Sequence, residues 1–179
     1  MWLPNIVKGV DTLTANDNFH IRPATPDDVS LILTFIKGLA EFEHLSEEVT
    51  ATETGLRDSL FGANPAAEVS LAFVSGIPAG FAVYFHNYST FLGQRGIYLE
   101  DIFITSEHRS NGLGKLLLTH VANIAVEREC GRLEWSVLDW NENADRFYKG
   151  LGAKVMDDWR TFRMDGDALQ KLASNGGLR

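Results

Sequence analysis

The spacing of hydrophobic residues divides the chain into helical and extended segments. After Thr25, apolar residues recur every three or four positions, which predicts an amphipathic helix running to about His44. Thr25 is a favourable capping residue, and Pro26 followed by two aspartates is typical of a helix start. From residue 69 the period becomes that of strands. The predicted elements are a strand at 19–22, helices at 26–44 and 53–61, strands at 69–74, 79–86 and 94–104, a helix from 112 to about 130, a strand at 133–138, a helix at 141–149, one or two strands within 155–164, and a helix at 167–173.

This order of elements predicts a mixed α/β fold. We expect a central, mostly antiparallel mixed sheet with helices on both faces. Residues 1–17 show no sustained periodicity, so we expect them to form an N-terminal extension to a single domain over residues 18–179.

Composition narrows the class of protein. The chain is 45% hydrophobic and 22% charged, as in ordinary globular proteins, and its net charge is −8. That acidity argues against nucleic acid as a partner and is compatible with a small cationic substrate. Cys130 is the only cysteine, which excludes an intrachain disulfide, and the histidines show no metal-ligand spacing, so we expect no metal. Without a signal peptide or a membrane-length apolar run, we expect a cytoplasmic protein.

The most informative stretch is an apolar strand followed by a glycine-containing turn and a helix. Arg109-x-x-Gly112-x-Gly114 opens this helix. Glycines at a helix start leave backbone N–H groups bare, and the helix dipole favours negative charge there, so a pyrophosphate would fit beside Arg109 and Lys115. The alternative is a turn that only lets the helix begin. A dinucleotide fingerprint and a Walker loop are both excluded by spacing, because neither the third glycine nor the Ser/Thr is present.

This arrangement resembles the acetyl-CoA pyrophosphate loop of the GNAT N-acetyltransferase superfamily, whose element order matches residues 19–173. Three stretches, Ile21-Arg-Pro-Ala-Thr-Pro-Asp-Asp, Tyr98-Leu-Glu-Asp-Ile-Phe-Ile and Asp139-Trp-Asn-Glu-Asn-Ala-Asp-Arg-Phe-Tyr-Lys, look like the spermidine/spermine branch, which includes the thialysine acetyltransferases. The resemblance implies the GNAT fold, acetyl-CoA as co-substrate, a small primary amine as acceptor and a homodimer.

The resemblance also implies a cofactor site built largely from backbone. The strand at 102–104 would bind the pantetheine arm, and an N–H near Phe103 would polarise the acetyl carbonyl. Asn141 is equally explained as a helix cap. Ser110 stands where the family often has glycine, and Asn143 where proline is usual. The implied cofactor-binding residues are Ile102, Phe103, Ile104, Arg109, Ser110, Asn111, Gly112, Leu113, Gly114, Lys115, Asn141, Glu142 and Asn143.

By the same resemblance, Tyr148 is the catalytic acid that protonates the coenzyme A thiolate, and a phenol keeps its proton at neutral pH. The alternative is a packed aromatic pair with Phe147. Glu100 would face the acceptor amine, either as its base or only as a negative charge that positions it; pairing with a nearby arginine is the alternative. If the strand is regular, Glu100 and Asp101 point to opposite faces, and we choose Glu100 for the cleft.

Phe42 and Glu43 match the family's acceptor-binding pair, since an aromatic face and a carboxylate suit a cation. Two alternatives to this function stay open: acetylation of another amine, such as an amino acid, an aminoglycoside or a protein N-terminus, and a non-catalytic acyl-CoA-binding sensor.

Overall fold

The computed structural model describes residues 19–175, so the expected N-terminal extension lies outside the described residues. The chain divides after Ser136 into two compact units. The first contains a five-stranded sheet with strand order β1-β2-β3-β4-β5, antiparallel throughout except for the parallel pair β4 and β5. Its elements are β1 (Phe19–Pro23), α1 (Val29–Phe42), α2 (Glu53–Phe61), β2 (Glu68–Val74), β3 (Ile77–Ser89), β4 (Gln94–Ile104), α3 (Leu113–Glu127) and β5 (Leu133–Trp135), with single 3₁₀ turns at Pro26–Asp28, Ser46–Glu48 and Ser106–His108. The mixed, mostly antiparallel sheet predicted from the sequence is confirmed.

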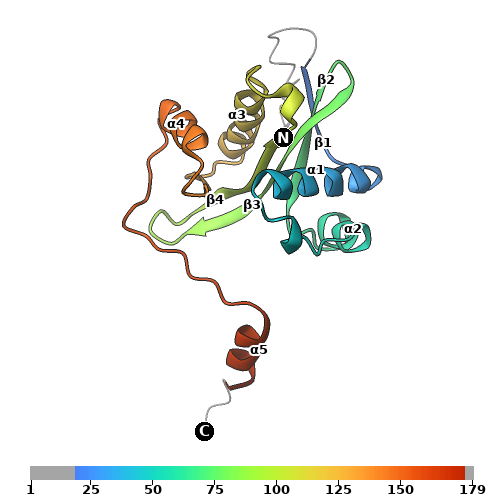
Figure 1. Ribbon diagram of the computed structural model, residues 1–179. Helices are drawn as coiled ribbons and strands as arrows, with labels where there is room; N and C mark the ends of the chain where they lie inside the picture. Colours follow the sequence, from blue (N-terminus) through green and yellow to red (C-terminus); the bar gives the residue numbers. More distant parts are fainter. Residues whose placement is uncertain (1–18, 176–179) are drawn as a thin grey trace, which may run out of the picture. The chain divides into compact units, whose positions relative to one another are not determined.

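Helices cover both faces of the sheet (Figure 1). On one face, Ile32 and Phe35 of α1 pack against a cluster that includes Phe81 of β3 and Phe103 of β4. The rings of Phe35 and Phe81 stack with their centroids 5.5 Å apart, and the core positions of each strand alternate with residues directed to the other face. Because Phe103 is buried against α1, the end of β4 is held close to that helix.

The opposite face is covered by α3. Five of its residues, Leu113, Leu117, Leu118, Val121 and Ala125, are buried. Ser70 of β2 is directed to this side, where its Oγ lies 3.0 Å from Nε2 of His120 and 3.3 Å from the hydroxyl of Tyr84. These contacts satisfy a fully buried hydroxyl that would otherwise be costly to remove from water.

The start of α1 is fixed by the carboxylate of Asp28. Both terminal nitrogens of the Arg22 guanidinium donate to it at 2.7 Å, and the backbone N–H and hydroxyl of Thr25 donate at 2.8 and 2.9 Å. The Arg22 guanidinium, helped by Thr25, holds the pKa of Asp28 far below its usual range. This one side chain therefore ties β1 to the helix that carries the candidate acceptor-binding residues.

Strand β4 is irregular at Glu100, contrary to the regular strand assumed from the sequence. The register with β3 pairs Leu99 with Tyr84 and Asp101 with Val83, so Glu100 is an extra residue without a partner. Such a β-bulge breaks the strict alternation of side chains between the two faces. Glu100 and Asp101 therefore need not point to opposite faces of the sheet, contrary to the prediction.

The second unit contains two helices, α4 (Glu142–Gly150) and α5 (Gly166–Asn175). The strands expected within 155–164 are absent from the described residues of this unit, and β5 ends at Trp135 instead of Leu138. A strand requires a neighbour to pair its N–H and C=O groups, and no strand lies between residues 137 and 175. The apolar side chains that favoured this prediction are therefore exposed, Phe162 to 92%.

Asp28→Asn should lower the free energy of unfolding at pH 7 by about 2 kcal/mol, because it removes a charged acceptor from three donor groups. The pKa of Asp28 is depressed on folding, so its contribution is complete above pH ~4, the unfolded value, and is lost as the pH falls further. Urea titrations at pH 7 and at pH 3 measure the difference. Asp27→Asn, at an exposed neighbouring aspartate, is the control; equal losses in both variants would contradict the role of Asp28.

Candidate functional site

The site begins where β4 and β5 part. These strands pair only from Ile97 to Leu99 with residues 133–135, and β5 ends there. Beyond Leu99, β4 continues to Ile104 and remains paired with β3 on its other edge. Five residues of β4 therefore present one backbone edge that no strand of residues 19–175 pairs with.

The register shows which amides lie on this open edge. The N–H of Thr105 donates to the carbonyl of Ala79 at 2.9 Å, so it is directed at β3. Successive N–H groups of a strand point alternately to its two edges. The N–H of Phe103 therefore also points to β3, and the N–H groups of Ile102 and Ile104 point to the open edge. An extended thioester chain could pair with these two amides, much as an added strand would.

The turn after β4 exposes a row of backbone donors. Gly112 caps α3 with φ of 82°, a left-handed conformation that favours glycine, and Ser110 has φ of 64°. The first N–H groups of α3 have no acceptor within the helix, because the first helical bond runs from Leu116 to the Gly112 carbonyl. A methyl group placed on Gly112 would meet nothing within 4 Å, and one on Gly114 would meet only Ile104 at 3.8 Å. The turn is thus open to an anion, and Lys115 is exposed beside it.

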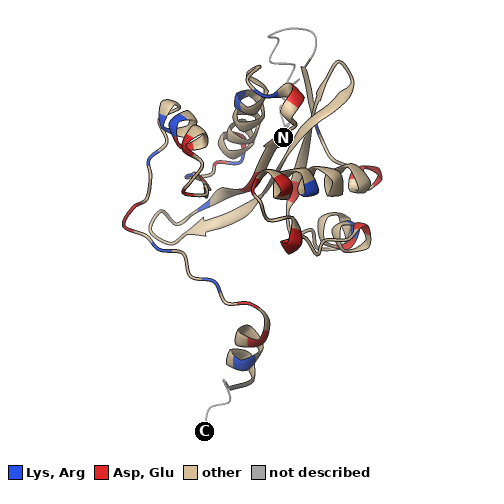
Figure 2. Ribbon diagram, in the orientation of Figure 1, with Lys and Arg blue, Asp and Glu red and all other residues tan. Residues whose placement is uncertain are grey.

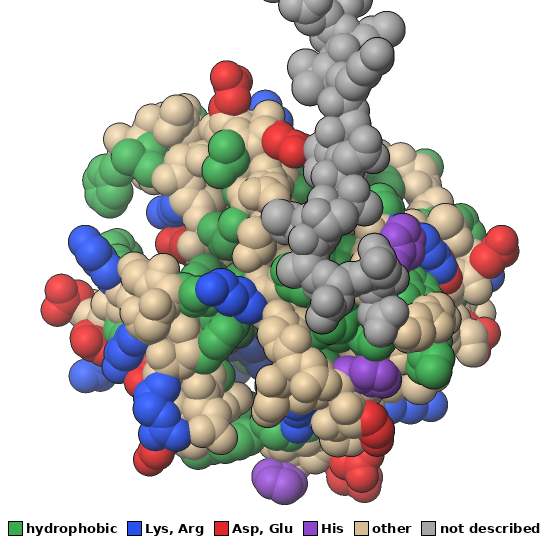
Figure 3. All heavy atoms as spheres, turned by 90° about the horizontal axis from the view of Figure 1, so that it is seen from above, with side chains coloured by type: hydrophobic (Ala, Val, Ile, Leu, Met, Phe, Trp, Pro, Cys, Tyr) green, Lys and Arg blue, Asp and Glu red, His purple; other side chains and the backbone are tan. Residues whose placement is uncertain are grey.

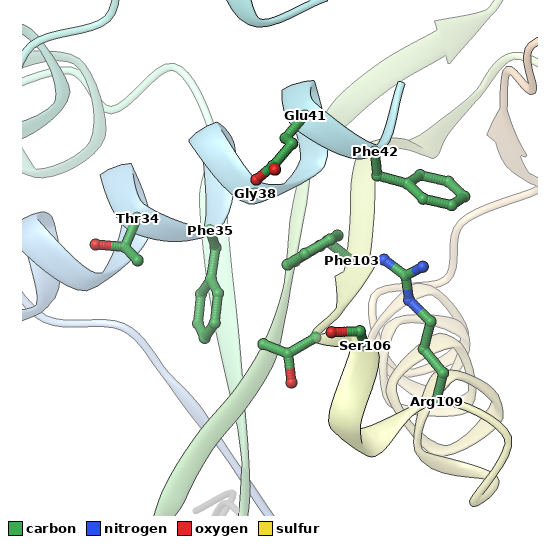
Figure 4. Close-up of a pocket in the computed structure, with 9 residues that line it drawn as sticks. Thr34, Phe35, Gly38, Glu41, Phe42, Phe103, Ser106 and Arg109 are labelled. Atoms are coloured by element: carbon green, nitrogen blue, oxygen red, sulfur yellow. The ribbon is translucent and has the colours of Figure 1, made fainter. Parts of the chain in front are cut away.

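Arg109 links this turn to α1. Its Nε donates to the Ile104 carbonyl at 2.8 Å, on the open edge of β4. Its guanidinium lies 4.3 Å from the centre of the Phe42 ring and 5.5 Å from that of Phe103 (Figure 4). A cation–aromatic contact therefore joins two residues that the sequence had assigned separately to the cofactor and to the acceptor.

Beneath this contact lies a cavity of about 360 Å³ between α1 and the end of β4 (Figure 4). Gly38 makes the close approach possible, since a Cβ at this position would stand 3.0 Å from the Phe103 ring. Sequence reasoning missed the cavity; a glycine in the middle of a helical pattern was the available signal. It is lined by Thr34, Phe35, Gly38, Glu41, Phe42, Phe103, Thr105, Ser106 and Arg109.

Three carboxylates gather near the end of α1. The pKa of Asp101 is raised to about 6, mainly because the carboxyl is buried. The negative charges of Glu100, at the bulge, and Glu43, at the end of this helix, raise it further. Burial also raises the pKa of Glu43. Glu100 itself is exposed. The pattern of β4 favoured Glu100 over Asp101 for the cleft, because a bulge depends on the register with β3 and leaves no signal in the sequence of β4 alone.

Acidic side chains also lie at both ends of α1 and on the segment that follows it (Figure 2). Between residues 41 and 48 the chain carries four glutamates and neither lysine nor arginine. On the face drawn in Figure 3, the basic side chains of the described residues are interspersed with acidic ones. The end of α1 therefore carries an excess of negative charge, beside the one guanidinium of Arg109 that lies over Phe42.

The remaining predicted residues belong to the second unit. Asn141 caps α4, its side chain accepting from the N–H of Ala144 at 3.1 Å, and Glu142 and Asn143 are exposed in the first turn. Tyr148 is half-buried on α4, edge-to-face with Phe147, and burial raises the pKa of its phenol above 10. The phenol therefore stays protonated at neutral pH and can donate a proton.

The first unit thus brings together Phe42, Glu43 and Glu100 with the open edge of β4, the glycine turn and Arg109. Among the described residues, no group of three or more His, Cys, Asp or Glu side chains is arranged to hold a metal ion. No helix in the described part of the chain is long and apolar enough to cross a membrane.

A mixed sheet in which β4 and β5 pair only over a few residues, followed by an open glycine turn at a helix N-terminus, is an arrangement that can hold an extended thioester and a pyrophosphate. Comparison with known proteins agrees, since residues 36–153 match the acetyltransferase (GNAT) family. The chain belongs to the GNAT family and is an N-acetyltransferase of amines that uses acetyl-CoA as its co-substrate.

Two curated relatives are similar over most of their length. The thialysine N-epsilon-acetyltransferase of Bos taurus is 38% identical over 86% of this chain and 96% of its own. The L-ornithine N5-acetyltransferase of Arabidopsis thaliana is 38% identical over 86% of this chain and 87% of its own. The resemblance to the thialysine branch, inferred from three short stretches, is confirmed.

Solved structures confirm the fold. An integron cassette protein from the mobile metagenome of V. cholerae superposes with a TM-score of 0.75, at 27% identity over 89% of this chain and all of its own. An aminoglycoside acetyltransferase from an uncultured soil sample, solved with trehalose, has a TM-score of 0.72 at 14% identity, covering 85% of this chain and 99% of its own. At that identity the second likeness concerns the fold alone.

Gly112→Ala should weaken acetyl-CoA binding at least tenfold, because a left-handed alanine strains the turn that presents the α3 amides. Gly76→Ala is the matched control: Gly76 has φ of 79° and open space around it, but lies in the turn between β2 and β3. Both variants should lose about 1 kcal/mol of unfolding free energy, and only Gly112→Ala should raise the acetyl-CoA Kd in calorimetric titration. Equal Kd values in the two variants would count against the turn as the pyrophosphate site.

Asp101→Asn should make the protein more stable at pH 7.5. The pKa of Asp101 is raised on folding to about 6, so its ionised form destabilises the folded state above that pH, and the effect disappears as the pH falls below ~4. For a half-buried group we expect a gain of about 1 to 2 kcal/mol at pH 7.5 and little at pH 4. Denaturant unfolding at both values measures it, with Asp58→Asn on the exposed side of α2 as control; a loss of stability at pH 7.5 would contradict it.

Proposed function

We propose that this protein transfers the acetyl group of acetyl-CoA to a primary amine of a small cationic substrate, a diamine, a polyamine or a thialysine-like amino acid. The observation that carries the proposal is the meeting of an aromatic face and carboxylates at the end of α1 with the open edge of β4. Relatives named for thialysine, for ornithine and for spermidine/spermine support this class, because each of these substrates presents an alkyl ammonium.

For the cofactor, we propose that the amides of Ile102 and Ile104 receive the thioester end of acetyl-CoA. One of these two N–H groups would polarise the acetyl carbonyl. The N–H of Phe103 itself does not suit this role, because it points to β3. The amides from Leu113 to Lys115, with the Lys115 ammonium, suit the pyrophosphate. The resemblance to the family adds Asn141, Glu142 and Asn143 as proposed cofactor-binding residues.

For the acceptor, we propose that Phe42, Glu43 and Glu100 receive the ammonium group. Glu43 and Glu100 supply the negative charge, and the ring of Phe42 supplies a face that a cation can approach. The cavity of about 360 Å³ beside Phe42 is large enough for a short carbon chain, and the rings of Phe35, Phe42 and Phe103 form the apolar part of its lining.

Transfer would proceed by direct attack in a ternary complex. An alkyl ammonium with a pKa near ~10.4 must first lose a proton to a carboxylate or to water. The free amine then forms the C–N bond while the C–S bond breaks, and Tyr148 gives its proton to the departing thiolate and recovers one from the amide nitrogen. Cys130 is not a candidate acyl carrier, because it lies beyond the C-terminal end of α3, whereas the glycine turn lies at the N-terminal end of that helix.

A thiol-release assay across an amine panel tests this function. Diamines, polyamines, thialysine and ornithine should be acetylated, and aminoglycosides and peptide N-termini should react at least a hundredfold more slowly in kcat/KM. Turnover only with aminoglycosides or peptides would reject the substrate class. Tight acetyl-CoA binding without turnover of any amine would instead favour a sensor. The resemblance also supports a homodimer, which equilibrium sedimentation would test.

Tyr148→Phe should lower kcat by about a hundredfold or more, because general acid catalysis typically contributes that much. The acetyl-CoA Kd and the melting temperature should change little, since the ring and its packing against Phe147 are kept. Phe147→Leu on the same helix is the control and should leave kcat within about threefold. An unchanged kcat in Tyr148→Phe with every amine that reacts would show that the phenol is not the acid.

A further inference from the structure

Asp101 is a half-buried carboxylate without a counter-charge. Within residues 19–136 it accepts no hydrogen bond and forms no ion pair, and the charges close enough to influence it are the like charges of Glu100 and Glu43. A carboxylate that loses solvation without gaining a partner is unfavourable for folding. Such a position in a folded chain is typical of a group retained for its chemistry.

The geometry directs Asp101 toward the proposed acceptor site. Asp101 and Phe103 share a face of β4, because they are two residues apart beyond the bulge, and Phe103 packs against α1. Glu43, at the end of α1, is near enough to act on Asp101 electrostatically. The residue paired with Asp101 on β3 is Val83, whose apolar side chain cannot hydrogen-bond to the carboxylate. The missing positive charge is what a bound ammonium would supply.

Asp101 is also next to the edge on which the thioester is expected. The amide of Ile102, the following residue, is the first of the two that point to the open edge of β4. An amine positioned by Asp101 would therefore lie close to an acetyl carbonyl that accepts a hydrogen bond from the Ile102 amide. Glu100, by contrast, is exposed at the bulge and solvated.

We propose that Asp101 is the catalytic carboxylate that takes the proton from the acceptor ammonium, while Glu100 and Glu43 hold the ammonium in place. This proposal rests on the proposed function and adds a residue to it. In the step, one N–H bond of the ammonium breaks and an O–H bond forms on Asp101, leaving a neutral amine that attacks the acetyl carbon. Asp101 returns its proton to water after product release.

The raised pKa of Asp101 suits the role of base. A carboxyl with its ordinary pKa is a very weak base for an ammonium, and burial together with two like charges raises the pKa of Asp101 to about 6. At neutral pH Asp101 is still mainly ionised, so it is both available and a stronger base than an exposed carboxylate.

The test is the pH dependence of kcat/KM between pH 4.5 and 9, with the best amine of the panel. The wild-type protein should lose activity below an apparent pKa near 6, as Asp101 becomes protonated in the free enzyme. In Asp101→Asn, kcat/KM at pH 7.5 should fall at least a hundredfold, and the loss of activity at low pH (the acid limb of the profile) should disappear. Asp101→Glu should recover part of kcat/KM together with the acid limb. Acetyl-CoA binding and thermal unfolding show that each variant is folded.

Glu43→Gln and Glu100→Gln are the matched variants. Each removes a like charge from beside Asp101, so the acid limb should remain and move to lower pH, with a smaller loss of rate caused mainly by a higher amine KM. A residue that only supported the structure would not move this limb.

If Asp101→Asn keeps the wild-type kcat/KM and the wild-type loss of activity at low pH, Asp101 is not the base, and the proposed acetyl transfer is unaffected. Loss of the limb in Glu100→Gln, with the limb kept in Asp101→Asn, would assign the base to Glu100 instead. If the wild-type protein acetylates no amine, the proposed function itself fails, and the role of Asp101 fails with it.

Discussion

The separation of β4 from β5 is the constraint on which the rest of this site depends. A parallel pair that continued past Leu99 would satisfy the backbone of β4 and leave no room for a third chain. Because the pairing stops and Glu100 is bulged out, the amides of Ile102 and Ile104 stay available on the open edge of β4, where we propose that the co-substrate binds. Binding of the thioester arm there would depend on backbone groups and not on particular side chains.

The same bulge concentrates negative charge near the end of α1, where we propose that the acceptor ammonium binds. It sets Glu100 and Asp101 close together, and α1, held against β4 through Phe103 and the gap left by Gly38, brings Glu43 to them. The electrostatic cost of this cluster in the free protein is offset by the core under α1 and by the anchoring of that helix through Asp28. Arg109 lies over the Phe42 ring and donates to the Ile104 carbonyl, so it connects the end of α1 to the open edge of β4.

Most elements could be predicted, and the failures share a cause. The helix over Glu53–Phe61 and the strand over Gln94–Ile104 follow from local period and capping alone, and the structure has both. Residues 155–164 have the same kind of apolar pattern, but a strand depends on a partner, which their own sequence does not provide. The bulge was missed for a related reason, since it is a property of the register between β3 and β4 and not of β4 by itself.

The sequence by itself determined the family, the position of the glycine turn and the types of residue that can do the chemistry, because these depend on side-chain identity and on spacing along one segment. Only the tertiary structure decided which amides of β4 are available, that Asp101 is deprived of solvent beside two like charges, and that Arg109 reaches Phe42. Each of these depends on groups that are far apart in the chain, and neither burial nor hydrogen-bond register exists until the sheet and α1 have packed together.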